Sequence, residues 1–190
     1  AIENSYMGSI HTNLYNFLKY DYEIIWEYYL EINHCICSKE DNLSDIKKAY
    51  SQMPALDQCY DYLKSKKIEP VSFSDTSLAA QYVSQSNNPW DAAICSEAAA
   101  KLNNLNILDK YIQDQQWNTT RFAIIVKSWT NIKYNRKSNK VSMLFEAKNE
   151  PSSLYNCLWV FANAWINLTK IESMPSYKWK FKYMFWIDFE

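Results

Sequence analysis

The chain has 190 residues, of which 48% are hydrophobic and 22% charged, and its formal net charge is −1. This composition is typical of a folded globular protein and excludes an intrinsically disordered one. The near-neutral charge gives no electrostatic reason to expect nucleic acid or a membrane surface as a partner, and no apolar run is long enough to span a bilayer. The opening AIENSYMGSI lacks the basic and apolar regions of a signal peptide.

The first two thirds of the chain alternate between strand and helix patterns. Residues 22–32 are rich in aromatic and β-branched types, which predicts a long strand. After a polar loop at 38–45, the pattern predicts a strand at 46–50, a helix from Pro54 to about Ser65, a strand at 71–73, a helix capped by Asp75, a strand at 92–94, a helix capped by Ser96 and a strand at 121–129. This alternation predicts an α/β fold with parallel strand pairing.

Residues 131–140 are polar and basic without periodicity, and we interpret them as a linker. Beyond them the pattern predicts a strand at 141–147, a helix at 152–164 and strands at 166–174 and 182–189. This β-α-β-β order fits half of a ferredoxin-like fold. We therefore expect one domain at 1–130 and a second, α+β domain at 141–190.

The cysteines predict reduced thiols in a cytoplasmic compartment, because their number is odd and no secretory signal precedes them. They are Cys35, Cys37, Cys59, Cys95 and Cys157. His34, Cys35 and Cys37 together could ligate a metal, but neighbouring residues of a strand face opposite ways and no second ligand cluster follows. We therefore expect buried thiols and no metal.

Glycine occurs once, at Gly8, where an average chain of this length carries about a dozen. Turns that need a positive φ must then use asparagine or accept strain. The pairs Asn87-Asn88 and Asn103-Asn104 stand where turns are expected.

Five segments, taken in order, resemble the prephenate dehydratase family. They are AIENSYMGSIH at 1–11, INHCI at 32–36, AYSQMPALDQC at 49–59, the run at 91–122 that ends in WNTTRF, and INLTKIESMPS at 166–176. Order and spacing agree along essentially the whole chain. The resemblance implies a two-lobed α/β dehydratase domain at 1–130, with its active site between the lobes, and part of an ACT domain at 141–190.

The implied reaction is the decarboxylating dehydration of prephenate to phenylpyruvate in L-phenylalanine biosynthesis, a lyase reaction. Loss of CO2 and hydroxide makes the ring aromatic, so the enzyme must supply only a proton to the departing hydroxyl, orientation and neutralisation of charge. No metal or organic cofactor is implied. The same residues do not distinguish prephenate from arogenate, its amino analogue, as the substrate.

The resemblance assigns catalytic roles to Thr120, which assists departure of the hydroxyl, and to Glu3, which holds or shares a proton. Because a threonine hydroxyl is a weak acid, we expect Thr120 to orient or relay a hydrogen bond rather than act alone. Substrate-binding roles are implied for Asn4, Ser5, Ser51, Gln58, Thr76, Arg121 and Phe122. The guanidinium of Arg121 is suited to hold a substrate carboxylate.

Structural roles stay open for several of these residues. Thr120 could simply begin a strand, where threonine is favoured, and Glu3 could lie at an exposed strand end. Gln58 could lie on a solvated helix face. Arg121 could pair with a structural acid instead of a substrate. Asp75, beside Thr76, could supply a charge to the site or be only a helix cap.

Family members with this ACT motif bind phenylalanine between paired ACT domains, which implies phenylalanine as an effector and a homodimer or tetramer. The implied binding residues are Ser152, Ser153, Leu154, Asn167, Leu168, Glu172 and Ser173. Two departures weaken this expectation: Ser152 replaces a glycine of the binding loop, and Met174 replaces an arginine. We therefore expect weak or absent phenylalanine binding. Trp165 replaces a glycine in a left-handed turn, which is expected to lower stability.

Relative to the family, the segment before E-N-S is absent, and the last ACT helix and strand would lie beyond Glu190. A chain shortened in this way is expected to have little activity by itself, and a preceding chorismate mutase domain stays an open question. The alternative is a dehydratase-like protein that has lost catalysis and serves as an amino-acid sensor or scaffold. A two-lobed solute-binding protein is disfavoured by the ACT-like segment. We expect a cytoplasmic protein, or a plastid one in a plant or alga.

Overall fold

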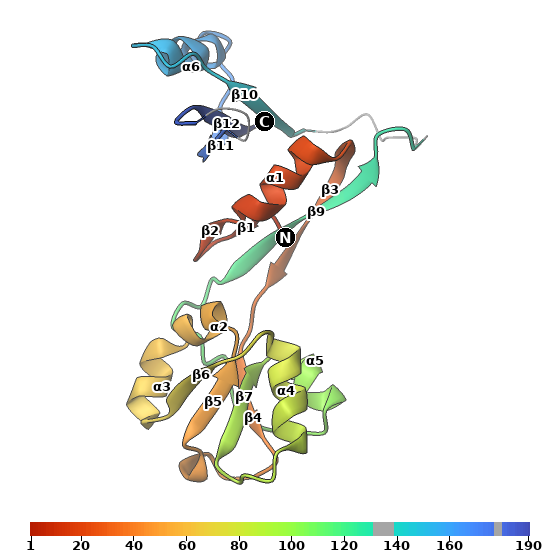
Figure 1. The fold of residues 1–190 in the computed structure, drawn as a ribbon, viewed down its shortest axis with the longest axis vertical. Coiled ribbons are helices and arrows are strands. Elements are labelled where there is room, and N and C mark those ends of the chain that lie inside the picture. The colour runs from red at the N-terminus through yellow and green to blue at the C-terminus, as the bar shows by residue number, and fades with distance from the viewer. Residues whose placement is uncertain (131–138, 177–179) are drawn as a thin grey trace. The chain divides into compact units, whose positions relative to one another are not determined.

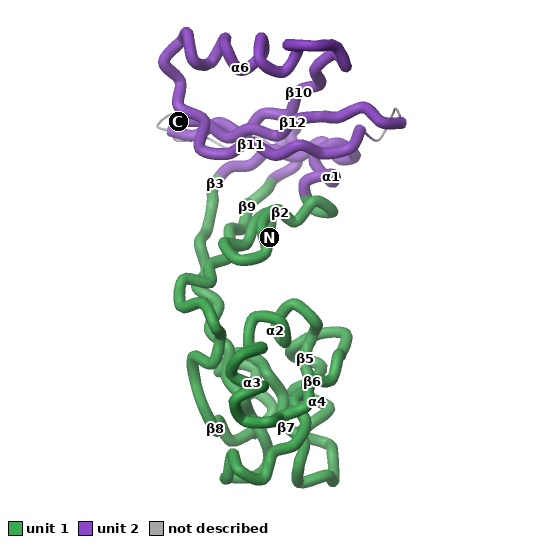
Figure 2. The backbone as a smooth tube through the Cα atoms, turned by 90° about the vertical axis from the view of Figure 1, so that its left-hand side faces the viewer, with its two compact units in different colours: residues 1–13, 26–125 green, residues 14–25, 126–190 purple. Residues whose placement is uncertain are grey.

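The computed structural model describes residues 1–130, 139–176 and 180–190, so most of the expected linker, 131–138, lies outside the described residues. The chain forms two compact units (Figure 2). Unit 1 comprises residues 1–13 and 26–125, and unit 2 comprises residues 14–25 and 126–190. Residues 14–25 thus group with the C-terminal part of the chain, which the expected boundary at 130 did not anticipate.

A five-stranded sheet in unit 1 has the order β6-β5-β7-β4-β8 (Figure 1). Its strands are β4 (Cys35–Ser38), β5 (Lys48–Ser51), β6 (Glu69–Ser72), β7 (Asp91–Cys95) and β8 (Asn106–Lys110). β5 pairs parallel with β6 and β7, but β4 pairs antiparallel with both β7 and β8. The expected parallel pairing is thus found where strands alternate with helices, whereas β4, which precedes this alternation, runs against the strands that the crossover helices connect.

Helices cover both faces of this sheet. They are α2 (Met53–Asp57), α3 (Tyr60–Lys66), α4 (Thr76–Gln85) and α5 (Glu97–Leu102), with a short 3₁₀ turn, η1, at Leu43–Asp45. On one face, residues of α4 and α5 pack with Cys35, Cys37 and Cys95, and on the other, residues of α2 and α3 pack with Ile36 and Ile94. The alternation of strand side chains between two cores explains why these strands read as continuous apolar runs. The expected burial of their thiols is confirmed.

Two helix starts confirm the sequence prediction. The Asp75 carboxylate accepts hydrogen bonds from the backbone N–H groups of Ser77 and Leu78, and the Ser96 hydroxyl accepts one from Ala99. The single helix expected from Pro54 to Ser65 is instead two helices, α2 and α3, with Gln58 as the C-cap of the first. Gln58 is buried, with an exposed fraction of 7%. Its interpretation as a solvated helix position is therefore wrong.

A second sheet joins distant parts of the sequence in the order β2-β1-β9-β3. Its strands are β1 (Glu3–Asn4), β2 (Gly8–Ser9), β3 (Tyr22–Glu31) and β9 (Thr119–Lys127). β1 pairs antiparallel with β9, which places Glu3 opposite Arg121 and Asn4 opposite Thr120. This register brings the first motif of the sequence against its TTRF motif.

Unit 2 contains a three-stranded antiparallel sheet of order β10-β12-β11. Its elements are α1 (His11–Lys19, of which residues 14–19 belong to this unit), β10 (Val141–Glu146), α6 (Ser153–Asn163), β11 (Leu168–Pro175) and β12 (Tyr183–Phe189). The β-α-β-β order expected after the linker is confirmed. In the described ranges, no helix combines the length and apolar character needed to cross a membrane.

Helices lie on both faces of the three-stranded sheet. The ring of Phe17 in α1 packs on Trp186, with centroids 5.5 Å apart, and the ring of Phe161 in α6 packs on Phe189 at the same separation. Because residues 186 and 189 of one strand face opposite sides, α1 and α6 cover opposite faces. The Tyr15 hydroxyl also donates to the carbonyl of Pro175. Helix α1 was not expected, because its segment HTNLYNFLK is poor in strong helix formers.

Left-handed backbone is common in this glycine-poor chain. In the described part, the non-glycine residues with positive φ are Lys67, Asn104, Tyr111, Ser152, Trp165 and Phe181. Asn104 is the asparagine among them, and at the other positions the chain accepts strain, which is the second possibility that the sequence left open. The left-handed turn expected at Trp165 is confirmed by its φ of 57°.

Candidate active site

The Asn4 side chain links Thr120 to the segment before it. Its Nδ2 donates hydrogen bonds to Thr120 Oγ1 at 3.0 Å and to Asn118 Oδ1 at 2.8 Å. All three residues are buried, with exposed fractions of 8%, 8% and 2% for Asn4, Thr120 and Asn118. Thr120 thus lies at the start of a strand, which was the alternative to a catalytic role. It also belongs to a buried polar cluster.

Backbone groups fix the orientation of this amide. Asn4 Oδ1 accepts hydrogen bonds from the backbone N–H groups of Tyr6 and Met7 at 3.0 and 2.9 Å. Since a backbone N–H can only donate, the Asn4 oxygen must point toward this turn and its NH2 group toward Thr120. Thr120 Oγ1 therefore accepts from Asn4, which leaves the Thr120 hydroxyl hydrogen to be donated to another group.

Gln58 and His34 extend the cluster on its other side. Asn118 Nδ2 donates to Gln58 Oε1 at 2.8 Å, and His34 Nε2 lies 2.8 Å from the same oxygen. We call the series Thr120, Asn4, Asn118, Gln58 and His34 the amide chain. Burial lowers the pKa of His34 below its ordinary value, an effect that its hydrogen bond to Gln58 opposes. The imidazole is therefore neutral near pH 7.

Asn118 and His34 were not among the site residues proposed from the sequence. Both nevertheless lie inside segments that carry the family resemblance, INHCI and WNTTRF. A signal was therefore present, but a buried histidine and an asparagine before a strand have many structural explanations.

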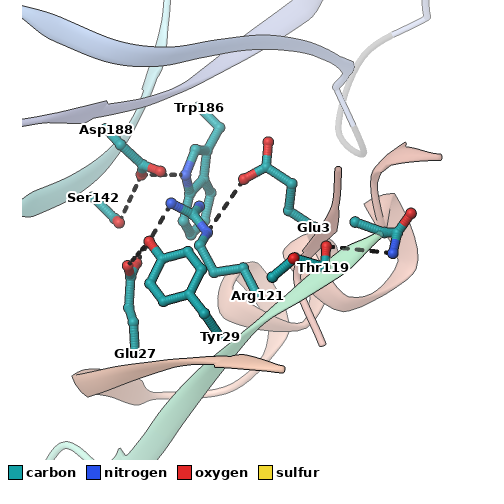
Figure 3. Close-up of polar contacts among 9 residues, drawn as sticks. Glu3, Glu27, Tyr29, Thr119, Arg121, Ser142, Trp186 and Asp188 are labelled. Carbon is teal, nitrogen blue, oxygen red and sulfur yellow. Dashed lines mark hydrogen bonds and ion pairs between the residues drawn. The ribbon is translucent and has the colours of Figure 1, made fainter. Parts of the chain in front are cut away.

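Arg121 is neutralised by two acids of its own unit. Its Nε lies 3.2 Å from Glu3 Oε2, and one terminal nitrogen, Nη1, lies 3.5 Å from Glu27 Oε1 (Figure 3). The side chains of Arg121 and Glu27 are 7% and 15% exposed. Tyr29 donates its hydroxyl to the other oxygen of Glu27 at 2.9 Å. Of the two roles left open for Arg121, pairing with a structural acid is the one the geometry displays.

The other proposed residues lie in two places: Ser5 and Phe122 at or beside β1 and β9, and Ser51 and Thr76 on β5 and α4. Ser5 lies beside the amide chain, since its hydroxyl donates to the carbonyl of Trp117 and accepts from the backbone N–H of Thr119, and so ties β1 to the start of β9. Phe122 follows Arg121 on β9 and is half-buried. Ser51 is fully buried at the end of β5 and donates to the carbonyl of Ile94.

Thr76 is the first residue of α4, directly after the Asp75 carboxylate that caps this helix. Because that carboxylate accepts two backbone hydrogen bonds, the cap interpretation of Asp75 is supported. Thr76 lies outside the amide chain.

The proposed phenylalanine-binding residues of unit 2 lie at two ends of its sheet. Leu168 and Val141 both pair with Phe189, whereas Met174 and Glu146 both pair with Met184. Asn167 and Leu168 are therefore at the end where β10 begins. Residues 152–154 start α6 near the end where β10 stops, and Glu172 and Ser173 approach that second end along β11. Within one chain these residues do not form a single cluster.

Among the residues that the structure describes, no three His, Cys, Asp or Glu side chains are arranged to hold a metal ion. The His34 imidazole, which could have joined Cys35 and Cys37, is bonded to Gln58 instead.

The family model for prephenate dehydratase matches residues 1–129, which contain the whole amide chain. The chain belongs to the prephenate dehydratase family. A prephenate dehydratase of Methanocaldococcus jannaschii is 39% identical over 100% of this chain and 69% of its own length. Arogenate dehydratase/prephenate dehydratase 1, a chloroplastic protein of Arabidopsis thaliana, is 38% identical over 100% of this chain and 52% of its own length.

A solved structure of this family has the same fold. The prephenate dehydratase of Arthrobacter aurescens, described as a complex with L-Phe, superposes with a TM-score of 0.84 at 26% identity, and the match covers 99% of this chain and 63% of that one. The chain thus spans about half to two thirds of the length of these relatives. Family membership and the mixed α/β fold of the chain are both established by these similarities.

Proposed function

We propose that the protein that carries this chain is a prephenate dehydratase, a lyase of phenylalanine biosynthesis. The observation that carries this proposal is the orientation of Thr120: its hydroxyl oxygen accepts from Asn4, so its hydrogen is available to a departing hydroxyl group. The setting is a buried one, where such a hydrogen bond is stronger than in water.

In the proposed reaction the bond between the ring and its carboxylate breaks, and its electron pair enters the ring as CO2 leaves. The bond from the ring to the hydroxyl group breaks at the opposite carbon, which yields phenylpyruvate. The Thr120 hydroxyl stabilises the departing hydroxide by donating a hydrogen bond, and a proton from solvent completes the water molecule. Aromatisation supplies the driving force, so positioning and charge stabilisation are the enzyme's task.

We assign Glu3 a different role from the proton carrier expected from the resemblance. Its carboxylate is paired with the Arg121 guanidinium at 3.2 Å. Glu3 then holds Arg121 in place rather than supplying the proton. The NH2 group of Gln58, together with Ser5 and Phe122, is assigned to the substrate.

Phenylalanine regulation is a proposal for unit 2. The candidate residues lie at both ends of the three-stranded sheet, an arrangement that fits a site shared by two copies, each giving one end. The related Arthrobacter structure is described as a complex with L-Phe. We propose a homodimer or tetramer in which phenylalanine binds weakly, because Ser152 takes the place of a glycine. A cytoplasmic location is part of the same proposal.

The test is the formation of phenylpyruvate from prephenate by the protein that carries residues 1–190, at its natural length. Arogenate is assayed in parallel with detection of phenylalanine, which ranks the two substrates by kcat/KM. Turnover of either compound supports a dehydratase. Absence of both products, from a protein that unfolds cooperatively, would favour the non-catalytic sensor or scaffold instead.

A further inference from the structure

The direction of every hydrogen bond in the amide chain follows from one turn. Asn4 Oδ1 accepts from two backbone N–H groups, so Asn4 Nδ2 donates to Asn118 Oδ1. Asn118 must then present its own NH2 group to Gln58, whose Oε1 accepts at 2.8 Å. Because Gln58 Oε1 is an acceptor, the His34 nitrogen 2.8 Å away must be the donor. The geometry therefore specifies the tautomer of His34 that carries hydrogen on Nε2.

The two donors on the Gln58 oxygen also fix the direction of the Gln58 NH2 group. With Oε1 of Gln58 held by Asn118 and His34, the Gln58 NH2 group points away from both. The backbone of Gln58 is fixed as well, because its carbonyl accepts from Asp114 N–H at 2.7 Å at the break between α2 and α3. Only one amide orientation satisfies these partners.

His34 is itself held rigidly. Its backbone N–H donates to Gln113 Oε1 at 3.0 Å, and its carbonyl accepts from Ile112 N–H at 3.1 Å. The side chain is 6% exposed. A rigid, buried donor of this kind can fix the orientation of a neighbouring amide without itself reaching a ligand.

We infer that His34 is a positioning residue: its Nε2–H holds the carbonyl end of the Gln58 side chain so that the NH2 end donates to a carboxylate of the substrate. The inference rests on the proposed function and adds to it a residue that acts through Gln58. Without the imidazole donor, the amide can rotate and present its oxygen to the substrate anion, which repels it.

Kinetics with paired variants test this role. His34→Leu removes the donor, and His34→Gln keeps an N–H donor at a similar distance from the backbone. The expected result is that His34→Leu raises the KM for prephenate about tenfold or more, the effect of losing one hydrogen bond to a charged group, and changes kcat less. His34→Gln restores most of the loss.

A double-mutant cycle separates positioning from general loss of structure. Gln58→Ala alone should weaken kcat/KM, and adding His34→Leu to Gln58→Ala should cause no further loss, since the residue that His34 orients is already gone. Losses that multiply in the double variant, or a parental KM in His34→Leu, would overturn the inference.

A spectroscopic measurement tests the arrangement without turnover. Long-range ¹H–¹⁵N correlation spectra of the imidazole rings report the tautomer, and the only other histidine, His11, is exposed and can be assigned by His11→Asn. The expected result near neutral pH is hydrogen on Nε2 of His34. An active protein with hydrogen on Nδ1 would overturn this inference, whereas an inactive protein with hydrogen on Nε2 would instead overturn the proposed function.

Discussion

Asn4 and Thr120 lie opposite each other on β1 and β9, and the Asn4 side chain donates a hydrogen bond to the Thr120 hydroxyl although the two residues are 116 positions apart. Asn4 also closes the turn at Tyr6 and Met7 through its oxygen. One side chain therefore orders the N-terminal loop and sets the direction in which the catalytic candidate can donate its hydrogen.

Replacing Asn4 by aspartate tests this relationship. Asn4→Asp keeps the oxygen that the Tyr6 and Met7 N–H groups need, but it presents a second oxygen to Thr120, which then donates its hydrogen to the aspartate. We expect kcat for prephenate to fall about 100-fold or more, the usual size of lost general-acid assistance. The control is Asn156→Asp, the same change at an exposed position of α6. A parental kcat in Asn4→Asp would contradict the assigned direction.

The burial of His34 predicts a dependence of stability on pH. Its pKa is lowered in the folded protein from the ordinary value of 6.5, so the unfolded chain binds the proton more readily. The contribution of neutral His34 is therefore complete above pH 6.5 and is lost as the pH falls below it. Urea unfolding at several pH values should show the free energy of unfolding decreasing over this range, with a flatter profile in His34→Gln. Equal slopes in the two proteins would count against a buried neutral imidazole.

Trp165 has a left-handed backbone conformation, so we expect glycine at this position to make the protein more stable. Its φ is 57°, and its side chain is 95% exposed, so little contact is lost on truncation. Trp165→Gly should raise the free energy of unfolding by about 1 kcal/mol, since a left-handed conformation costs a non-glycine residue about that much. Ala164→Gly is the control: its φ is −86°, where glycine brings only added entropy to the unfolded chain. Urea midpoints that rank the two variants in the opposite order would refute the strain.

Phenylalanine binding should be weak, and Ser152 should be one cause. This residue has a φ of 65° directly before α6, and a side chain at this loop hinders close approach of a ligand to the backbone. Isothermal titration calorimetry should detect no micromolar binding in the parent and a gain of affinity in Ser152→Gly. Micromolar affinity in the parent would show that serine is compatible with the site.

The parts of the fold that were predicted correctly are those marked by short-range sequence patterns. The caps at Asp75 and Ser96 were readable because a side chain and the N–H groups that it satisfies lie within three residues of each other. The β-α-β-β order of the C-terminal part was readable from periodicity alone. The helix break at Gln58 was not, because an apolar face continues across it from Leu56 to Leu63 and hides the change of direction.

The candidate site depends on pairings that no local pattern encodes. Arg121 meets Glu3 across the β1–β9 register, and its second acid, Glu27, comes from a third strand. His34 and Gln58 meet where both bond to the segment 112–114, although their sequence contexts suggested only a strand and a helix. The motifs named most of the residues, while their hydrogen-bond directions required the three-dimensional structure.

The role of the Thr120 hydroxyl in departure of the ring hydroxyl group is tested by kcat for phenylpyruvate formation in Thr120→Ala and Thr120→Ser. Urea unfolding is the control for folding. We expect Thr120→Ala to fold, to lose about 1–3 kcal/mol of stability because the buried Asn4 donor loses its acceptor, and to lose about 100- to 10,000-fold in kcat. Thr120→Ser, which keeps the hydroxyl, should retain most of the parental rate. A Thr120→Ala protein that forms phenylpyruvate as fast as the parent would contradict this role of the hydroxyl.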